Sequence, residues 1–386
     1  MKKSLHLFLA VMAVLVLVVS ACAPAATPAP TQPPATEEPT QVATEEPTEV
    51  ATEEPTEAAT EPPTEAPATE PPTPTPPPPP NCEKLPNAPA APAAGELGSP
   101  EKPIVITFVP SGDTGKITTA GTAIAECLSE MTGLSFEMEV GTTFAASIEA
   151  MGAEKAQVGF LNTFSALLGG AKYGITPALV AIRKYATNDL DPDKALGGEL
   201  QPFYKAQFIA SADSGVNSFA DLKGKTFCFV DPNSTSGYIV PRIILAANGI
   251  NPDTDFAATV NAGSHPNVAV AVYQGDCDAG VTFINVLTDE AADLQATYPD
   301  IAEKVKVFAV SDRIPNDGMQ FIQSLDPALK QVITEGLLAM AEDPGGKAVL
   351  KSLYNYDAFQ EVDPAFYNDF LQVLQSAGVD PASLVK

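Results

Sequence analysis

Residues 231–238 of the sequence read Asp-Pro-Asn-Ser-Thr-Ser-Gly-Tyr, and this stretch decides the expected fold. An apolar run at residues 226–230 precedes it, with the length and the aromatic content of a buried parallel strand. An apolar segment at residues 238–248, closed by Gly249, follows it and predicts a helix. The stretch is therefore expected to turn from a strand into a helix.

The residues around the expected helix start suggest a site for an anion. Pro241 is tolerated only in the first turn of a helix, which places the start near Gly237 and leaves Ser234, Thr235 and Ser236 around the N-terminus. Free backbone N–H groups, hydroxyl donors and the positive end of the helix dipole together favour a tetrahedral oxyanion. The alternative is that the three hydroxyl groups only cap the helix.

The N-terminal segment is typical of an exported lipoprotein. Two lysines, Lys2 and Lys3, precede an apolar run at residues 5–19 that is too short for a permanent membrane span. The following Val-Ser-Ala-Cys at residues 19–22 resembles the lipobox of bacterial lipoproteins. We expect a signal peptide at residues 1–21 and a lipid on Cys22. The alternative is an ordinary secreted protein with a chance cysteine.

Residues 22–80 have the composition of a disordered tether rich in Pro, Thr and Glu. An octad that begins at Ala35 repeats from Ala43 and Ala51, and no repeat carries an apolar face. The segment has eleven glutamates and no lysine or arginine, so it repels itself and has almost nothing to bury. Proline favours an extended path. We expect this segment to hold a folded domain away from the outer face of the cell membrane.

The remainder of the chain has a normal globular composition and an acidic balance. Residues 81–386 carry 19 lysines and arginines against 37 aspartates and glutamates, a balance that argues against a nucleic-acid partner, and we expect none. A small anion is still allowed, because backbone dipoles rather than net charge would hold it. The length suits two α/β lobes. We expect the first lobe at residues 81–205, the second at 206–308, and a return to the first lobe at 309–386.

Four cysteines in the exported part allow three disulfide pairings. We favour Cys82 with Cys127, which would attach the start of the domain to its first helix. We also favour Cys228 with Cys277, which would link neighbouring strands. Four buried thiols are the alternative.

An approximate internal repeat suggests two similar lobes. A helix at residues 143–151 is followed by a strand ending at Asn162, and a helix at 265–273 is followed by a strand ending at Asn285. Each copy places a hydroxyl group, Thr143 or Ser264, near a helix start. Ser111 lies on another expected turn from a strand to a helix. In two lobes built this way, the sheet edges that carry these strand ends and helix starts can face one cleft.

These motifs resemble the PhnD-like family, the solute-binding proteins of phosphonate, phosphite and phosphate ABC importers. The resemblance rests on residues 231–238, on Gly-Ser-His at 263–265 and on Gly-Asp-Cys-Asp-Ala-Gly at 275–280, and it covers about residues 103–374. It implies a type II periplasmic binding fold, in which two α/β lobes are joined by two crossing strands, near residues 205–210 and 305–310. It also implies ABC permease subunits as partners and a small phosphorus oxyanion as ligand.

The resemblance also implies the ligand-binding residues. Ser234, Thr235 and Ser236 would form the cradle, with His265 donating a further hydrogen bond. Phe144 replaces a family tyrosine, Ala166 stands near another, and Ile284 or Asn285 replaces a family acid, which implies an apolar wall without strong preference for an aminoalkyl group. The full expected set is Ser111, Thr143, Phe144, Asn162, Thr163, Ser234, Thr235, Ser236, His265 and Asn285.

The same residues argue against an enzyme. His6 and His265 are the only histidines, which excludes a multi-histidine metal site, and Ser236 lacks the glycine two residues before it that a nucleophile elbow carries. We expect no catalytic residue, no metal and no cofactor. The alternatives are another small anion such as a sulfonate, a sensor role, or a surface phosphoesterase, which ranks last.

The expected tether should be dispensable for folding and for ligand binding. Deleting residues 35–72 should leave the melting temperature and the ligand affinity of a soluble form unchanged, because a segment without apolar side chains adds nothing to a core. Thermal melts and calorimetry on both forms measure this. A shift of several degrees would show that the tail docks on the domain.

Overall fold

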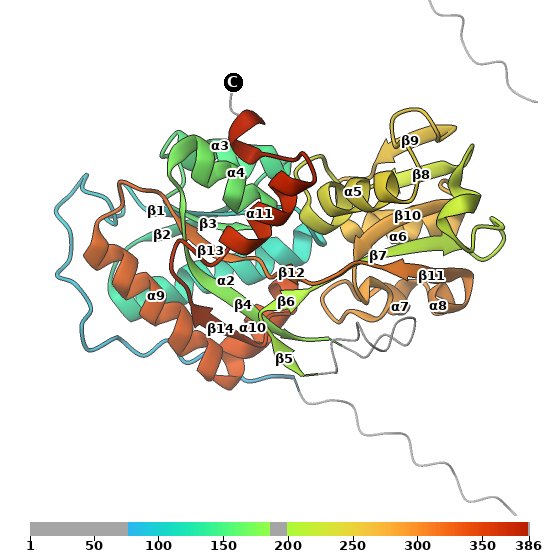
Figure 1. Ribbon diagram of the computed structural model, residues 1–386. Helices are drawn as coiled ribbons and strands as arrows, with labels where there is room; N and C mark the ends of the chain where they lie inside the picture. Colours follow the sequence, from blue (N-terminus) through green and yellow to red (C-terminus); the bar gives the residue numbers. More distant parts are fainter. Residues whose placement is uncertain (1–75, 186–198, 385–386) are drawn as a thin grey trace, which may run out of the picture. The chain divides into compact units, whose positions relative to one another are not determined.

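A computed structural model describes residues 76–185 and 199–384 (Figure 1). The expected signal peptide, Cys22 and the tether up to residue 75 lie outside the described residues. No helix in these two ranges is long and apolar enough to cross a membrane. The described chain forms two sheets with helices packed on them, which is the mixed α/β class expected from the sequence.

The first sheet has seven strands in the order β14-β4-β13-β3-β1-β2, with β5 added on β4. β1, β2 and β3 are parallel, whereas β13 runs antiparallel to β3 and β4. Its strands are β1 (Ile104–Phe108), β2 (Phe136–Val140), β3 (Val158–Leu161), β4 (Thr176–Lys184), β5 (Leu200–Gln201), β13 (Gly318–Phe321) and β14 (Ala358–Glu361). Its helices are α2 (Thr114–Thr132), α3 (Phe144–Gly152), α4 (Thr163–Tyr173), α9 (Pro327–Glu342), α10 (Pro344–Tyr354), α11 (Asn368–Ser376) and the short η5 (Pro381–Leu384).

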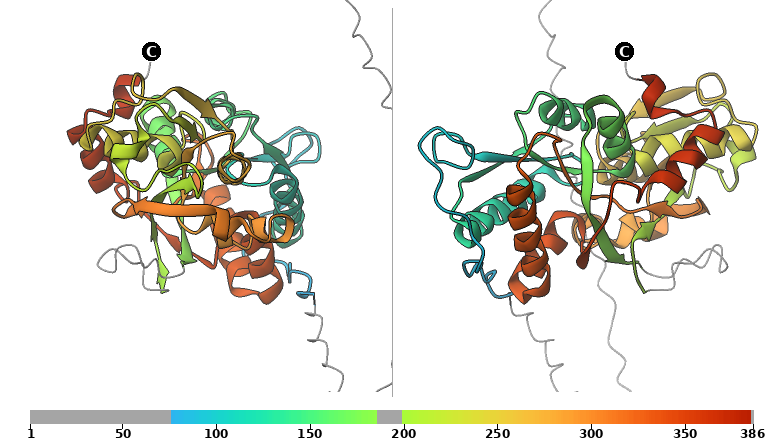
Figure 2. Two further views of the ribbon diagram at one scale, coloured as in Figure 1. Left: turned by 90° about the vertical axis from the view of Figure 1, so that its right-hand side faces the viewer. Right: turned by 60° about the vertical axis from the view of Figure 1, so that its left-hand side comes forward.

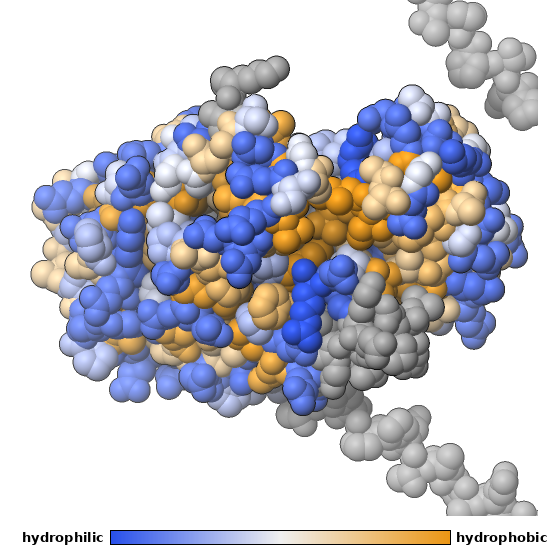
Figure 3. Space-filling model, viewed as in Figure 1, coloured by the Kyte–Doolittle hydropathy of each residue, from blue (hydrophilic) through white to orange (hydrophobic). Residues whose placement is uncertain are grey.

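The second sheet has five strands in the order β11-β7-β10-β8-β9, and the left view of Figure 2 brings it to the front. Its strands are β7 (Ala206–Ser211), β8 (Thr226–Phe229), β9 (Ala258–Asn261), β10 (Ala279–Phe283) and β11 (Val305–Val310). The helical segments are η2 (Phe219–Leu222), η3 (Thr235–Ile239), α5 (Val240–Ala247), α6 (His265–Gln274), η4 (Val286–Thr288), α7 (Leu294–Thr297) and α8 (Ile301–Lys304). Figure 3 shows an apolar strip over α5, where Ile243 and Ile244 are half-buried.

The segments that link the two sheets lie a few residues away from the expected positions. Residues 206–210 and 305–310 are strands, but both belong to the five-stranded sheet, as β7 and β11. The link is made by β6 (Phe203–Tyr204) and β12 (Ile314–Pro315), which pair antiparallel as a separate two-stranded sheet. The apolar patterns of residues 205–210 and 305–310 predicted strands without showing which sheet they join.

The helix starts are fixed by side-chain caps that follow strand ends. Asp113, Thr143, Asn162, Ser234 and Ser264 each accept a hydrogen bond from the backbone N–H three residues on. Capping of this kind satisfies one of the free amides and leaves the others at the helix end. Because these caps follow β1, β2, β3, β8 and β9, the helix N-termini gather at the carboxyl edges of the sheets.

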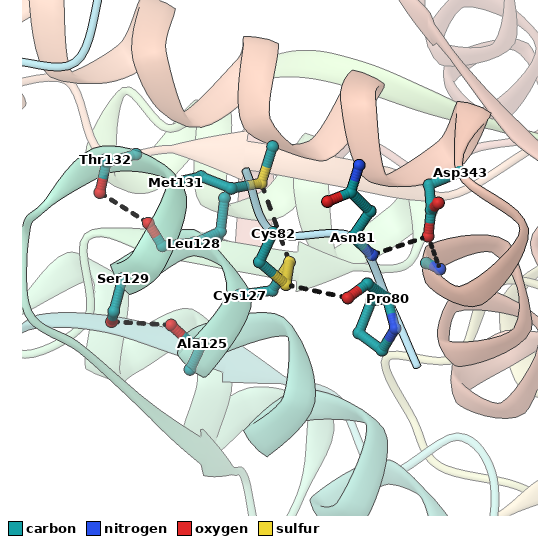
Figure 4. Close-up of a disulfide and its surroundings, with 11 residues drawn as sticks. Pro80, Asn81, Cys82, Ala125, Cys127, Leu128, Ser129, Met131, Thr132 and Asp343 are labelled. Carbon is teal, nitrogen blue, oxygen red and sulfur yellow. Dashed lines mark hydrogen bonds between the residues drawn. A yellow bond between two sulfur atoms is a disulfide. The ribbon is translucent and has the colours of Figure 1, made fainter. Parts of the chain in front are cut away.

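Two disulfides hold the pairs of cysteines favoured from the sequence. Cys82 and Cys127 are joined with an S–S length of 2.06 Å, which fastens the segment before β1 to α2 (Figure 4). On the same segment, Asn81 N–H donates to Asp343 at 3.0 Å (Figure 4). Cys228 in β8 bonds to Cys277, just before β10, at 2.02 Å. Each bridge connects elements that already pack together.

The two disulfides should contribute nearly equal stability. Their loops differ little, with separations of 45 and 49 residues, and the stabilisation in the chain-entropy account grows only with the logarithm of loop length. The double serine variants at residues 82/127 and 228/277 should each lose about 2–4 kcal/mol of unfolding free energy. Urea unfolding measures both losses. A much larger loss in one variant would show that local packing, and not loop closure, dominates there.

Candidate functional site

A cavity of about 50 Å³ lies at the carboxyl edges of both sheets, with residues of both halves in its wall. The half with the seven-stranded sheet contributes Ser111, Gly112, Asp113, Lys116, Phe144, Asn162, Arg183, Asp317, Leu353 and Tyr354. The half with the five-stranded sheet contributes Ser234, Ser236, His265, Phe283 and Asp289, and β6 contributes Tyr204. A water needs roughly 10–15 Å³ of such space, so the cavity has room for only a few atoms of that size.

The stretch at residues 231–238 turns from strand to helix, as expected. Ser234 is the N-cap of η3, and its Oγ accepts from Gly237 N–H at 3.1 Å. The first turn is a π-helix that begins at Thr235, slightly before the expected start, and Pro241 lies in the first turn of α5. Gly237 is required because a Cβ there would lie 2.3 Å from Val230 Cγ2. This close packing holds the serines against β8.

The three hydroxyl residues of this turn do not share one role. Ser234 and Ser236 are buried and line the cavity. Thr235 is absent from the described wall, and its Oγ1 accepts a hydrogen bond of 2.9 Å from Phe164 N–H in α4. Because α4 belongs to the other half of the domain, this bond joins the two halves beside the cavity. The pattern Ser-Thr-Ser alone could not separate these roles.

His265 is positioned as a neutral hydrogen-bond donor. Its Nδ1 accepts from Phe283 N–H at 3.0 Å, so the single proton of the neutral ring is on Nε2. Nε2 lies 3.5 Å from Ser234 Oγ, and the ring lines the cavity. Burial, with a contribution from the charge of Arg183, lowers the pKa of His265 to about 3. The ring therefore offers a donor without carrying a charge at neutral pH.

Arg183 and Asp289 bring a buried ion pair to the cavity wall. Arg183 is in β4, and its Nη2 lies 3.2 Å from Asp289 Oδ2, with side chains 8% and 5% exposed. Burial opposes the charge of Arg183, but nearby groups, including Tyr185, Asp289 and Asp317, raise its pKa above the ordinary value. The sequence analysis missed this pair. The available signal was one arginine near the end of an otherwise apolar strand.

Tyr204 and Asp317 reach the cavity from the two linking segments. Burial raises the pKa of Tyr204, and the side chains of Ser236 and Thr235 hydrogen-bond to it. Burial also raises the pKa of Asp317, against the charge of Arg183, and Tyr356 Oη donates to its Oδ2 at 2.8 Å. Both residues were missed, because the linking segments were placed a few residues away.

The other expected site residues divide into two groups. Ser111, Phe144 and Asn162 line the cavity with Ser234, Ser236 and His265. Thr143 Oγ1 accepts from Ala146 N–H, Thr163 Oγ1 donates to Pro315 O at 2.7 Å, and Asn285 N–H donates to Gln207 Oε1. These last three residues are not among the described residues of the wall.

The expectation about the side walls needs correction. Ala166 does not face this cavity and lines another one beside α11. The strand end at residues 284–285 carries no acid, as the sequence shows, but Asp289 and Asp317 from elsewhere in the chain line the cavity. Asp289 lies four residues after Asn285 and returns to the wall through η4. A search limited to the strand end at residues 284–285 could not find it.

Several hydrogen bonds connect the two halves around the cavity. Asn162 Nδ2 donates to Asn233 O at 2.9 Å, and His265 N–H donates to Ser111 O at 3.1 Å. Lys116 Nζ contacts Ala291 O at 3.1 Å and Asp293 at 3.2 Å. These bonds hold the two halves closed on each other at the cavity. Within the part of the chain that the structure describes, no cluster of His, Cys, Asp and Glu could hold a metal ion.

The depressed pKa of His265 predicts a dependence of stability on pH. An unfolded histidine has a pKa near 6.5, so below that pH protons bind the unfolded chain in preference to the folded one. Stability is therefore kept above pH 6.5 and falls toward pH 3, by up to about 1.4 kcal/mol per pH unit. Relative to His265→Gln, the wild type should lose stability only below pH 6.5. Urea unfolding from pH 8 to 4.5 measures this, and a constant difference would contradict it.

Comparison with known proteins identifies the family. The sequence model of the family described as "ABC transporter, phosphonate, periplasmic substrate-binding protein" matches residues 106–367. The chain is 30% identical over 193 residues to the phosphate-import protein PhnD of Mycolicibacterium smegmatis, which is 48% of this chain and 56% of that protein. It is 30% identical over 187 residues to the phosphonates-binding periplasmic protein of Escherichia coli, and this match covers 47% of this chain and 53% of that protein. The chain thus spans about half the length of these curated relatives.

Solved structures show the same fold. A binding protein component of an ABC phosphonate transporter from Pseudomonas aeruginosa superposes with a TM-score of 0.61 at 23% identity, covering 71% of this chain and 87% of that one. PhnD1 from Prochlorococcus marinus, solved with methylphosphonate, gives a TM-score of 0.59 at 15% identity, covering 71% and 98%. These are type II periplasmic binding folds, and the matched family consists of transport components and not of enzymes. The chain belongs to the family of periplasmic substrate-binding proteins of phosphonate ABC transporters.

Proposed function

We propose that the protein is a lipid-anchored, extracytoplasmic receptor that captures a small phosphorus oxyanion and delivers it to the permease subunits of an ABC importer. Family membership supports the importer role, and the lipobox-like sequence ending at Cys22 supports the anchor. The ligand would be phosphate, phosphite or a simple phosphonate. The lobes, residues 81–205 with 309–386 and residues 206–308, would close on it.

One observation carries the choice of ligand. Ser234, Ser236 and His265 line one small cavity at the N-terminal ends of η3 and α6, and the neutral ring of His265 carries its proton on Nε2. All three are hydrogen-bond donors, and two helix ends add free backbone N–H groups. A compact anion with several oxygen atoms matches such a set, because each donor can meet a separate oxygen.

The cradle is tested by removing one donor. Ser236→Ala should weaken binding of methylphosphonate, phosphite or phosphate by about 1–3 kcal/mol, the cost of leaving a desolvated acceptor short of a donor. Calorimetry on the purified domain gives the affinities. Ser376→Ala is the matched control, because it removes a serine hydroxyl from α11, far along the chain from the cavity wall.

Two results would contradict the proposal. Equal affinity in the wild type and Ser236→Ala would remove the site from this turn. A wild type that binds sulfate or methylsulfonate, and none of the three phosphorus ligands, would leave the fold intact and change the ligand class. A ligand panel read by thermal shift detects both cases, because a ligand that binds only the folded state raises the melting temperature.

A further inference from the structure

Five charged side chains line the cavity with the serines and His265. Two of them, Asp113 and Lys116, belong to the start of α2, where the exposed Asp113 accepts from Lys116 N–H at 2.8 Å. Asp289 and Asp317 are carboxylates, and Arg183 is the cation paired with Asp289. Two carboxylates in a pocket of this size would ordinarily recognise a ligand with an ammonium group, because buried charges need partners. Such recognition requires carboxylate oxygens that have no partner within the protein.

Asp289 is already saturated by groups of the protein. Its Oδ1 accepts from the backbone N–H groups of Ala291 at 3.1 Å and Ala292 at 3.0 Å. Its Oδ2 accepts from Arg183 Nη2 at 3.2 Å and Asn355 Nδ2 at 2.7 Å. A carboxylate offers about four lone-pair sites, so these four donors use its capacity. Asp289 therefore positions Arg183 and is not available to a ligand.

Arg183 is held in place by more than this ion pair. Its guanidinium carbon lies 4.9 Å from the ring centroid of Tyr185 and 5.3 Å from that of Phe283. Both distances suit cation–π contacts, and Phe283 also lines the cavity. Within the described residues, the buried Nε–H of Arg183 has no hydrogen-bond partner. The side chain thus brings a fixed positive charge to the wall of the cavity.

Asp317 is the carboxylate that lines the cavity beside Arg183 and Asp289. Its Oδ2 accepts from Tyr356 Oη, and the charge of Arg183 acts on it across the cavity wall. Burial raises the pKa of Asp317, and the charge of Arg183 acts against this rise. With Arg183 present, an incoming ammonium group would meet a positive charge, and Asp289 has no free acceptor site to offer it.

We propose that Arg183 is a specificity-determining residue, an internal cation that takes the place a ligand ammonium group would occupy. The pocket then selects small phosphorus oxyanions without a cationic substituent and rejects aminoalkylphosphonates. This inference rests on the proposed function and names the substrate class of the same site.

The test compares two ligands of nearly equal size and different charge. Ethylphosphonate has a terminal methyl group where aminomethylphosphonate has an ammonium group. The ratio of their affinities therefore reports the charge preference of the site. The wild type should bind ethylphosphonate at least tenfold more tightly. In Arg183→Met this ratio should fall at least tenfold, because Asp289 and Asp317 lose their cation. Arg183→Lys should keep most of the wild-type preference, which a purely structural role of Arg183 does not predict.

A matched control and separate outcomes make the test decisive. Lys172→Met removes a cation paired with Glu149 on the surface and should leave the ratio unchanged. A wild type that binds aminomethylphosphonate as tightly as ethylphosphonate would overturn the inference, even if Arg183→Met does not fold. An unchanged ratio in a folded Arg183→Met would also overturn it. Failure of the wild type to bind any phosphorus oxyanion, methylphosphonate included, would instead refute the proposed function.

Discussion

The hydrogen bond from Phe283 N–H to His265 Nδ1 is the interaction on which the site depends. It fixes the proton of the ring on Nε2, toward Ser234 and the cavity. Burial keeps the ring neutral, so the donor persists across the range of pH in which histidine normally changes charge. Without this bond the ring could place its proton on either nitrogen, and the cavity could lose one of its side-chain donors.

The fold supplies this arrangement by bringing strand ends together. β10 delivers Phe283, α6 begins at His265, and the turn after β8 delivers the serines, so three short segments of the five-stranded half converge. The disulfide between Cys228 and Cys277 connects β8 to the turn just before β10. Across the cavity, α4 and the loop after β1 contribute Phe164 N–H and Ser111 O, which bond to Thr235 and His265. Closure of the two halves and formation of the site are therefore coupled.

The local parts of this structure could be predicted from the sequence, because their causes are local. The turn at residues 231–238, the cap at Ser264 and the αL glycine Gly275 each follow from a side chain or a backbone angle within a few residues. The two disulfides required only that neighbouring elements pack. Fold class and family followed from combining these pieces.

The charged part of the wall could not be predicted, because it depends on contacts distant in sequence. Arg183 and Asp289 are 106 residues apart, and the strand that carries Arg183 reads as apolar core. Asp317 follows a linking segment, β12, whose position was expected a few residues earlier. The sequence pattern predicted that Thr235 belongs to the cradle with its neighbours. Only the position of α4 shows that the Thr235 hydroxyl instead accepts a hydrogen bond from Phe164 N–H. The spacing of residues along the chain does not show which parts of the two halves come into contact.

Nitrogen-15 NMR of the His265 imidazole tests the central claim most directly. His265 is the only histidine in residues 81–386, so its two ring nitrogens give the only imidazole signals of the folded domain. We expect an unprotonated Nδ1 and a protonated Nε2 at pH 7, with the Nε2–H resonance moving as methylphosphonate is added. A proton on Nδ1, or an Nε2–H resonance that saturating methylphosphonate leaves unchanged, would contradict it.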